Sequence, residues 1–128
     1  MLRNVLNKYR EFSDSLLESI LYNYNIDNSK SYIELTLSCT NAENDFSYEK
    51  VKLIMKEINE FILIESYNAD NKMVIKDALL KEENGLIIFD FDPIDHFDYL
   101  EENPNSTFKI KSKQIKISPD GASMSRNR

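Results

Sequence analysis

The chain has 128 residues, of which 41% are hydrophobic and 30% are charged, a composition typical of one soluble globular domain. It excludes the disordered, collagen-like and disulfide-framework classes, because the apolar content suffices for a core and only one cysteine is present. Sixteen Lys and Arg residues against twenty-two Asp and Glu residues give a net charge of −6, which disfavours nucleic acid or an anionic membrane as partner and favours a basic protein.

The N-terminal third is predicted to hold a short helix and a β-hairpin. Apolar residues recur at helical spacing over residues 1–11, and they alternate with polar residues over 15–24 and 32–40. The buried face of the second strand is expected to carry Ile33, Leu35, Leu37 and Cys39. Residues 25–30 are polar and predict the turn that joins the two strands.

Residues 48–66 fit two patterns. A helical stripe would be formed by Val51, Ile54, Met55, Ile58 and Ile62. A strand in two phases would instead place Val51, Leu53, Met55, Phe61 and Leu63 on one face, with a bulge near residues 57–59. The spacing leaves helix and strand open.

A second hairpin is predicted around the dipeptide Asn84-Gly85. It separates the apolar runs 73–80 and 86–91, and both of its residues tolerate the positive φ that a type I′ turn requires. Pro93 ends the second run, because proline lacks the N–H that a sheet ladder needs.

The remaining chain is predicted to form one or two helical turns over residues 94–102 and a strand over 108–117. The apolar phase of this strand changes, which indicates a bulge near Lys113 or Gln114. The expected fold is therefore α+β: a mainly antiparallel β-sheet of about five to seven strands in hairpins or a meander, with one or two short helices.

The chain is expected to be a cytoplasmic protein with one globular domain over residues 1–120 and a disordered tail over 121–128. The first ten residues lack the continuous apolar segment of a secretory signal, and no window has the roughly 20 apolar residues of a membrane-spanning helix. Cys39 lies on an apolar strand face, so we interpret it as a buried small side chain rather than a nucleophile.

Charges segregate in the C-terminal third of the sequence. Residues 82–102 contain eight acidic residues and no Lys or Arg, and four of the aromatic residues interleave with them (Phe89, Phe91, Phe97 and Tyr99). A basic strand follows, with lysines at 109, 111, 113 and 116. In one interpretation, these lysines balance the acidic segment or protect a sheet edge from aggregation.

In the other interpretation, the acidic segment is a recognition patch, in which aromatic side chains anchor a basic partner and carboxylates steer it. The partner-binding residues predicted on this basis are Asp90, Asp92, Asp95, Phe97, Asp98, Tyr99, Glu101 and Glu102. Such a patch suits a protein that masks a nuclease by imitating its phosphate-rich substrate.

The acidic segment also contains residue types that catalytic or metal sites use. The run Leu86–Asp92 resembles the first motif of the haloacid-dehalogenase-like phosphotransferases, in which Asp90 would be the nucleophile and Asp92 an acid/base. Only 36 residues follow Asp92, too few for the rest of that fold, and Pro93 replaces the usual glycine. A Ca²⁺ or Mg²⁺ site could also be built from Asp90, Asp92, Asp95, His96 and Asp98, but the central glycine of an EF-hand is missing. We therefore expect no enzyme activity, metal or cofactor.

The segment Phe12-Ser13-Asp14-Ser15, followed by a strand and by residues 32–37, resembles the opening of a set of small β-rich bacterial proteins, some of them immunity-like. Those proteins begin Phe-His-Asp-Ser, and Ser13 stands where they have His. The resemblance covers about the first forty residues, and it implies that residues 48–66 are strand rather than helix.

The resemblance implies an immunity protein of the contact-dependent growth inhibition type, which binds and neutralises a cognate toxin domain, here expected to be a nuclease. Two other functions remain as alternatives. One is a small metal-dependent phosphatase-like enzyme that uses Asp90 and Asp92. The other is a structural or adaptor subunit whose lysine-bearing strand pairs with another sheet edge.

Overall fold

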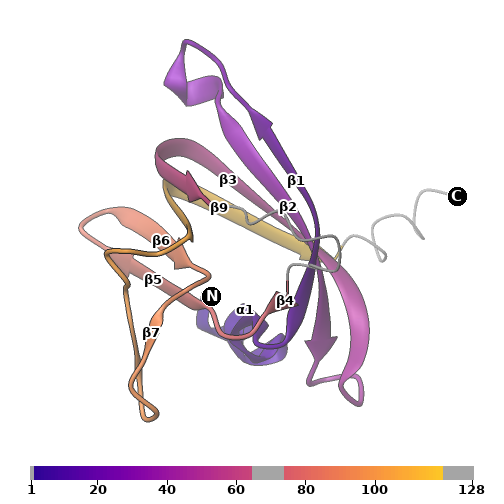
Figure 1. Cartoon of the computed structure of the whole chain (residues 1–128). Helices are drawn as coiled ribbons and strands as arrows, with labels where there is room; N and C mark the ends of the chain where they lie inside the picture. The colour runs from indigo at the N-terminus through magenta and orange to yellow at the C-terminus, as the bar shows by residue number, and fades with distance from the viewer. Residues whose placement is uncertain (1, 65–73, 120–128) are drawn as a thin grey trace, which may run out of the picture.

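The computed structural model describes residues 2–64 and 74–119, and it consists mainly of antiparallel β-sheet (Figure 1). The elements are α1 (Leu2–Lys8), the 3₁₀ helices η1 (Arg10–Phe12) and η2 (Asn28–Lys30), and the strands β1 (Ser15–Asn23), β2 (Tyr32–Asn41), β3 (Ser47–Leu63), β4 (Val74–Ile75), β5 (Leu79–Glu83), β6 (Leu86–Asp90), β7 (Ile94–Asp95), β8 (Leu100–Glu101) and β9 (Phe108–Pro119). The expected mainly antiparallel sheet is confirmed. The predicted tail over residues 121–128 lies outside the described residues.

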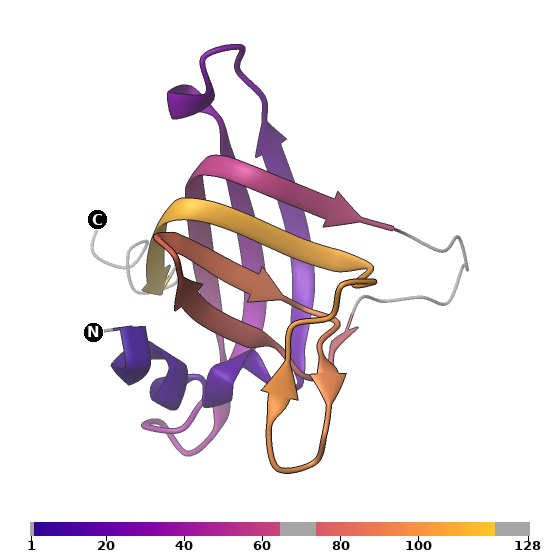
Figure 2. The same ribbon diagram turned by 90° about the vertical axis from the view of Figure 1, so that its left-hand side faces the viewer.

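Seven strands form one curled sheet in the order β4-β1-β2-β3-β9-β6-β5, and β7 and β8 form a separate hairpin (Figure 2). β4 and β5 lie at opposite edges of the sheet, yet only residues 76–78 separate them. The four Cα steps from Ile75 to Leu79 can span at most about 14 Å. The sheet therefore curls until its two edge strands approach each other at this end.

The concave face of the sheet holds the core. The inward residues predicted on β2 (Ile33, Leu35, Leu37 and Cys39) are all buried, together with Val51, Leu53 and Met55 on β3. Leu6 of α1 and Phe12 of η1 belong to the same cluster. The N-terminal helices thus cover part of the concave face, which a one-layer sheet cannot bury by itself.

An aromatic chain crosses this core from the N-terminal helices to β9. Tyr9 stacks on Phe12 and Phe12 contacts Phe89, with ring centroids 5.9 and 5.7 Å apart. Phe91 lies between Phe89 and Phe108, with centroids at 4.0 and 4.1 Å. Phe89 and Phe91, which the recognition-patch interpretation had interleaved with surface acids, are therefore core residues.

The strand alternative is confirmed for residues 48–63, which belong to β3, whereas residues 65 and 66 lie outside the described residues. β3 pairs with β2 on one side and with β9 on the other, and its register shifts between Ile58 and Glu60, next to the positive φ of Glu57. The predicted bulge on this strand is confirmed. The bulge predicted on β9 near Lys113 or Gln114 is wrong, because the extra residue lies on β3 opposite Lys111 and Ser112.

Two other predictions concern hairpins. β5 and β6 flank Asn84 and Gly85, whose φ values of 54° and 79° confirm the predicted turn chemistry. The single strand predicted over 73–80 is instead two short strands on opposite edges of the sheet, and Met73 lies outside the described residues.

The helical turns predicted over residues 94–102 are wrong. This segment forms the hairpin of β7 and β8, in which Ile94 pairs with Glu101 and Asp95 with Leu100. His96 N donates to the carbonyl of Tyr99 at 3.0 Å, which closes the turn. Within the described part of the chain, no helix has the length and apolar character needed to cross a membrane.

Candidate functional site

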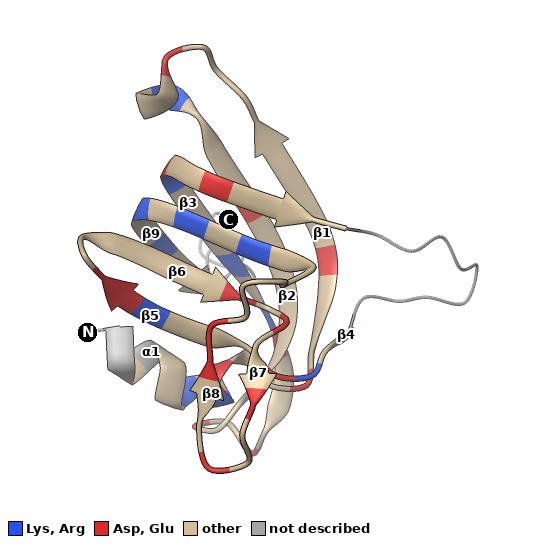
Figure 3. Cartoon of the chain, turned by 60° about the vertical axis from the view of Figure 1, so that its left-hand side comes forward, with Lys and Arg blue, Asp and Glu red and all other residues tan. Residues whose placement is uncertain are grey.

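Residues 90–102 of the acidic segment lie at one end of the sheet, where the β7–β8 hairpin projects away from the rest of the chain, whereas Glu82 and Glu83 lie at the other end of β5 (Figure 3). The structure divides the eight predicted partner-binding residues into two groups. Asp90, Asp92 and Glu102 bond to the body of the protein, whereas Asp95, Phe97, Asp98, Tyr99 and Glu101 lie exposed on the hairpin.

Asp90 is a buried structural carboxylate at the end of β6, with 0% of its surface exposed. Its Oδ1 accepts hydrogen bonds from Asp92 N at 2.9 Å and from Ser106 Oγ at 2.7 Å, and its Oδ2 accepts one from Asn103 N at 2.7 Å. The prediction that Asp90 contacts a partner is wrong, because no atom of it reaches the surface. The same burial leaves no path by which a substrate could approach Asp90 as a nucleophile.

Asp92 stabilises the same loop from its outer side. Its Oδ2 accepts hydrogen bonds from Thr107 N at 3.2 Å and from Thr107 Oγ1 at 3.1 Å, and its carbonyl accepts one from Asn103 Nδ2 at 2.9 Å. Both aspartates therefore hold the connection between β8 and β9 against the end of β6. This use of the Asp-x-Asp pair differs from the phosphotransferase motif that it resembles.

Glu102 lies at the centre of a cluster of lysines. Its Oε2 lies 3.0 Å from Lys109 Nζ and 3.1 Å from Lys111 Nζ, and its Oε1 lies 3.7 Å from Lys81 Nζ. Burial raises the pKa of Glu102, but the hydrogen bonds from Lys109 and Lys111 outweigh it and hold that pKa below its ordinary value. Glu102 is thus occupied by internal charge pairs with three lysines, and its role as a steering group stays a prediction.

The lysine-bearing strand β9 lies inside the sheet, between β3 and β6. β6 covers β9 only at residues 109–112, so Lys109 and Lys111 do not protect a sheet edge. Residues 113–119 of β9 pair with β3 but with no described strand on their other side, so edge protection by Lys113 and Lys116 and the adaptor alternative stay predictions. The other interpretation, in which the strand balances the acidic segment, is confirmed for Lys109 and Lys111. Lys109 is only 3% exposed, and its ammonium also donates to the carbonyl of Asn103 at 2.7 Å.

The exposed group surrounds the turn of the β7–β8 hairpin. Phe97 is 100% exposed and Tyr99 is 58% exposed, and Asp95 and Asp98 lie beside them. Phe97 has a φ of 74°, a conformation that is costly for a bulky side chain. Asp95 Oδ1 accepts a hydrogen bond from Phe97 N at 2.8 Å and so supports this conformation. The turn therefore exposes the Phe97 ring to solvent in a strained backbone conformation.

His96 and Glu101 form a pair on the side of the same hairpin. Their Nε2 and Oε1 atoms lie 2.8 Å apart, and the His96 ring stacks on Tyr99 with centroids 4.6 Å apart. Cys39 lies in the core, away from this exposed histidine, so the two cannot share a zinc ion. Over residues 2–64 and 74–119, no three His, Cys, Asp or Glu side chains are placed to hold a metal.

A cleft of about 290 Å³ lies beside the hairpin. Its lining residues are Glu11, Ser13, Asp77, Ala78, Asp95, Phe97, Asp98, Tyr99 and Leu100, which include four carboxylates and no Lys or Arg. The sequence reasoning missed Glu11 and Asp77, because they join the hairpin only through the fold. The positive φ values at residues 10–12, which place Glu11 here, have no signature in the sequence.

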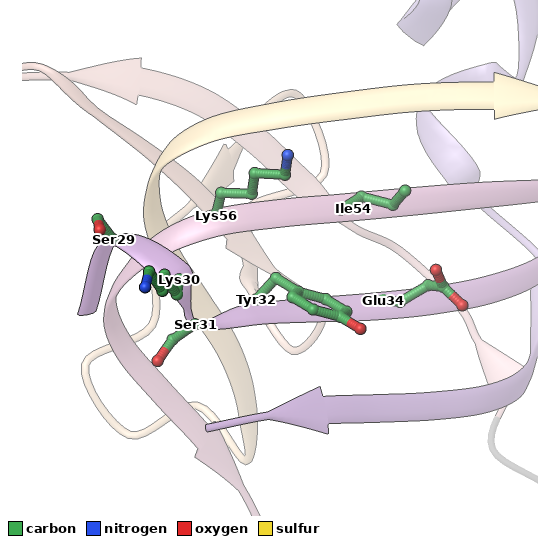
Figure 4. Close-up of a pocket in the computed structure, with 7 residues that line it drawn as sticks. All are labelled: Ser29, Lys30, Ser31, Tyr32, Glu34, Ile54 and Lys56. Atoms are coloured by element: carbon green, nitrogen blue, oxygen red, sulfur yellow. The ribbon is translucent and has the colours of Figure 1, made fainter. Parts of the chain in front are cut away.

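A larger groove of about 470 Å³ lies on the outer face of β2 and β3, next to η2 (Figure 4). It is lined by Ser29, Lys30, Ser31, Tyr32, Glu34, Ile54 and Lys56. Glu34 pairs with Lys52 at 3.7 Å, and the two lysine ammonium groups that line the groove do not point toward each other. The groove therefore has mixed charge without a convergent set of polar groups, and the hairpin remains the candidate site.

Comparison with known proteins returned no match: no family model, no curated protein and no solved structure resembles this chain.

Proposed function

We propose that this chain is an immunity protein that neutralises a basic bacterial toxin domain by binding it through the β7–β8 hairpin and the adjacent acidic cleft. The observation that carries the proposal is the fully exposed Phe97 ring, held at positive φ beside a cleft that is lined by four carboxylates. Exposed aromatic side chains at the centre of a polar surface are typical energetic anchors of protein interfaces. The free energy gained when a partner buries the ring would offset the backbone strain of this turn.

The charge of the cleft supports a basic partner. Its carboxylates come from three separate segments: Glu11 of η1, Asp77 before β5, and Asp95 and Asp98 of the hairpin. Such a surface raises the association rate of a basic protein and competes with phosphate groups for the same positive surface. A nuclease toxin, whose substrate-binding surface must be basic, has the matching chemistry.

The resemblance to immunity-like proteins supports the class of partner and not the contact residues. Phe12 and Ser15 of the Phe-Ser-Asp-Ser segment are buried, so this motif acts in the fold. The contact surface of the proposal comes from the hairpin, which lies outside the segment that carries the resemblance.

The test uses the toxin domain encoded beside the gene for this chain, with association and dissociation measured by stopped-flow and growth measured on co-expression. Phe97→Ala is expected to accelerate dissociation by about tenfold or more. Asp95→Asn combined with Asp98→Asn is expected to slow association at low salt and to flatten its salt dependence.

The β2–β3 turn offers matched controls for both variants. Phe46 is also an exposed phenylalanine at positive φ, and Glu43 and Asp45 are exposed acids beside it. Phe46→Ala and the double variant Glu43→Gln with Asp45→Asn are expected to leave binding and rescue unchanged. Equal losses in the two turns, or hairpin variants that bind like the parent, would refute the proposed surface. A toxin domain that neither binds the chain nor is inhibited by it would refute the proposed function.

A further inference from the structure

Within residues 2–64 and 74–119, no strand pairs with most of the outer edge of β1 (Figures 1 and 2). β4 pairs with that edge only at Ser15 and Leu16, and no other strand of the described residues pairs with it. On its inner side, the stretch 19–23 pairs regularly with β2, from Ser19 with Thr36 to Asn23 with Tyr32. Alternate backbone N–H and C=O groups of residues 19–23 therefore face outward from an ordered strand, in position to pair with another one.

The two edges of the sheet differ in how they are protected. The edge strand β5 carries three charges in five residues, at Lys81, Glu82 and Glu83. The open stretch of β1 carries none and contains Ile20, Leu21 and Tyr22. Leu21 is 50% exposed and Tyr22 is 44% exposed. Charged side chains normally discourage pairing at a sheet edge, so the edge of β1 has the chemistry of a pairing surface and that of β5 does not.

We propose that β1 pairs antiparallel with β1 of a second copy of this chain, which joins the two sheets in a two-fold symmetric dimer. The edge offers backbone groups and apolar side chains but no charge, so an apolar, uncharged strand is the complementary partner. Each copy of the chain presents such a strand in open form. A two-fold contact is also closed, which stops further growth and is consistent with a discrete dimer.

The register of this pairing follows from the neighbours of the open stretch. β4 occupies the edge at residues 15–16, and the pairing of β1 with β2 is irregular between Leu17 and Ser19. A register centred on Leu21 uses only residues 19–23 and keeps the second copy clear of both features. A register centred on Ile20 would instead place Asn23 of one copy opposite Leu17 of the other, at the irregular position of β1.

Centring on Leu21 places it opposite its own copy and places Ile20 opposite Tyr22. Ile20 and Tyr22 lie on the concave side, because they pair with the inward residues Leu35 and Ile33. Cross-strand pairs of a β-branched and an aromatic residue stabilise antiparallel sheets, and the symmetry forms this pair twice. Each Tyr22 ring also contacts Phe61 of its own chain, with centroids 5.3 Å apart, so the dimer continues an existing apolar surface.

Cross-linking tests the register. Facing residues of an antiparallel pair have Cα atoms roughly 4.5–5.5 Å apart, within the range of a disulfide. Under mild oxidation, Leu21→Cys is expected to form a covalent dimer. Asn23→Cys is the matched control, because its two copies would lie about 14 Å apart and stay unlinked. The native Cys39 is buried and does not interfere. Equal cross-linking of the two variants would overturn the register.

Light scattering and sedimentation of the full chain test the dimer itself. The parent chain is expected to dimerise, and Leu21→Lys, which places two ammonium groups opposite each other, is expected to raise the dissociation constant by about tenfold or more. Phe97→Lys is the control, an exposed apolar residue changed to the same cation on the β7–β8 hairpin, and it is expected to leave the dimer unchanged. A parent chain that is monomeric at all concentrations would overturn the proposal.

The dimer does not rest on the proposed function, and the same variants separate the two. Leu21→Lys is expected to dissociate the dimer and still bind the toxin domain, whereas Phe97→Lys is expected to do the opposite. A circular dichroism spectrum and thermal melt of Leu21→Lys verify that the fold is retained. If that variant unfolds, the cysteine pair at 21 and 23 still decides the question.

Discussion

Replacing Asp90 by alanine tests whether this carboxylate stabilises the fold or recognises a partner. The substitution removes the acceptor of three hydrogen bonds, from Asp92 N, Asn103 N and Ser106 Oγ. A buried donor left without an acceptor costs about 1–3 kcal/mol. The Asp92 and Asn103 N–H groups are part-buried, whereas the buried Ser106 hydroxyl still has the Phe108 carbonyl as an acceptor at 3.0 Å. We therefore expect the two backbone donors to account for a loss of about 2–3 kcal/mol in the free energy of unfolding.

That loss is a large share of the roughly 5–15 kcal/mol that stabilises a domain of this size. The assay is urea unfolding followed by far-UV circular dichroism, with equal slopes in the parent and the variant as the condition for comparing midpoints. Asp98→Ala is the matched control: this exposed aspartate belongs to the same acidic segment, and its removal is expected to change stability by about 0.5 kcal/mol or less. A loss below about 1 kcal/mol for Asp90→Ala, or equal losses for the two variants, would refute the structural role.

Three further predictions follow from the core and its turns. Cys39 is buried, and burial raises its pKa to about 11, so at pH 8 it is expected to react with a thiol reagent only as fast as the protein opens; rapid labelling would contradict its placement. Burial and the hydrogen bond to Glu49 raise the pKa of Tyr9 above its ordinary 10.0, so the stability that depends on this difference is present below pH 10 and is lost as the pH rises further. Urea midpoints across that range are expected to fall less in Tyr9→Phe, and equal falls would show that Tyr9 is not the group responsible. Gly85→Ala is expected to lower the free energy of unfolding by about 1 kcal/mol because of the positive φ alone, since no atom lies within 4 Å of the added methyl group. An unchanged melting temperature would contradict the turn geometry.

The parts of the fold that could be predicted from sequence are the strands that have one buried face and one solvent-exposed face. The alternation over β2 follows directly from that asymmetry, and the turn at Asn84 and Gly85 follows from local backbone chemistry. β3 could not be decided by spacing, because its bulge changes the apolar phase and produces an accidental helical stripe. Its conformation is fixed by hydrogen bonds to β2 and β9, and β9 lies about fifty residues later in the chain.

The hairpin of β7 and β8 was missed for a related reason. Its two strands are only two residues each, too short to show alternation. They are held in place by the loop that follows, whose Asn103 and Ser106 bond to Asp90 on a strand that precedes the hairpin. The sequence of residues 94–102 alone does not reveal these contacts with the rest of the chain.

The candidate site shows the same division. The sequence identified the acidic, aromatic-rich segment, but charge alone could not separate a buried carboxylate from an exposed one. Asp90 and Glu102 differ from Asp95 and Asp98 only through partners elsewhere in the chain, such as Ser106 and Lys109. Glu11 and Asp77, which complete the cleft, lie far from the segment in sequence and become neighbours through the curl of the sheet.

The position of β9 between β3 and β6 also constrains how the protein is made. On the ribosome, the β1–β2–β3 meander can form as soon as it emerges, and so can the β5–β6 hairpin. The strand that joins them is translated after both, so each half carries an unfinished edge until then. Such edges are prone to mispair, and closing contacts across so long a stretch of chain is slow. We expect the nascent chain to depend on chaperones during this interval and truncations before β9 to aggregate.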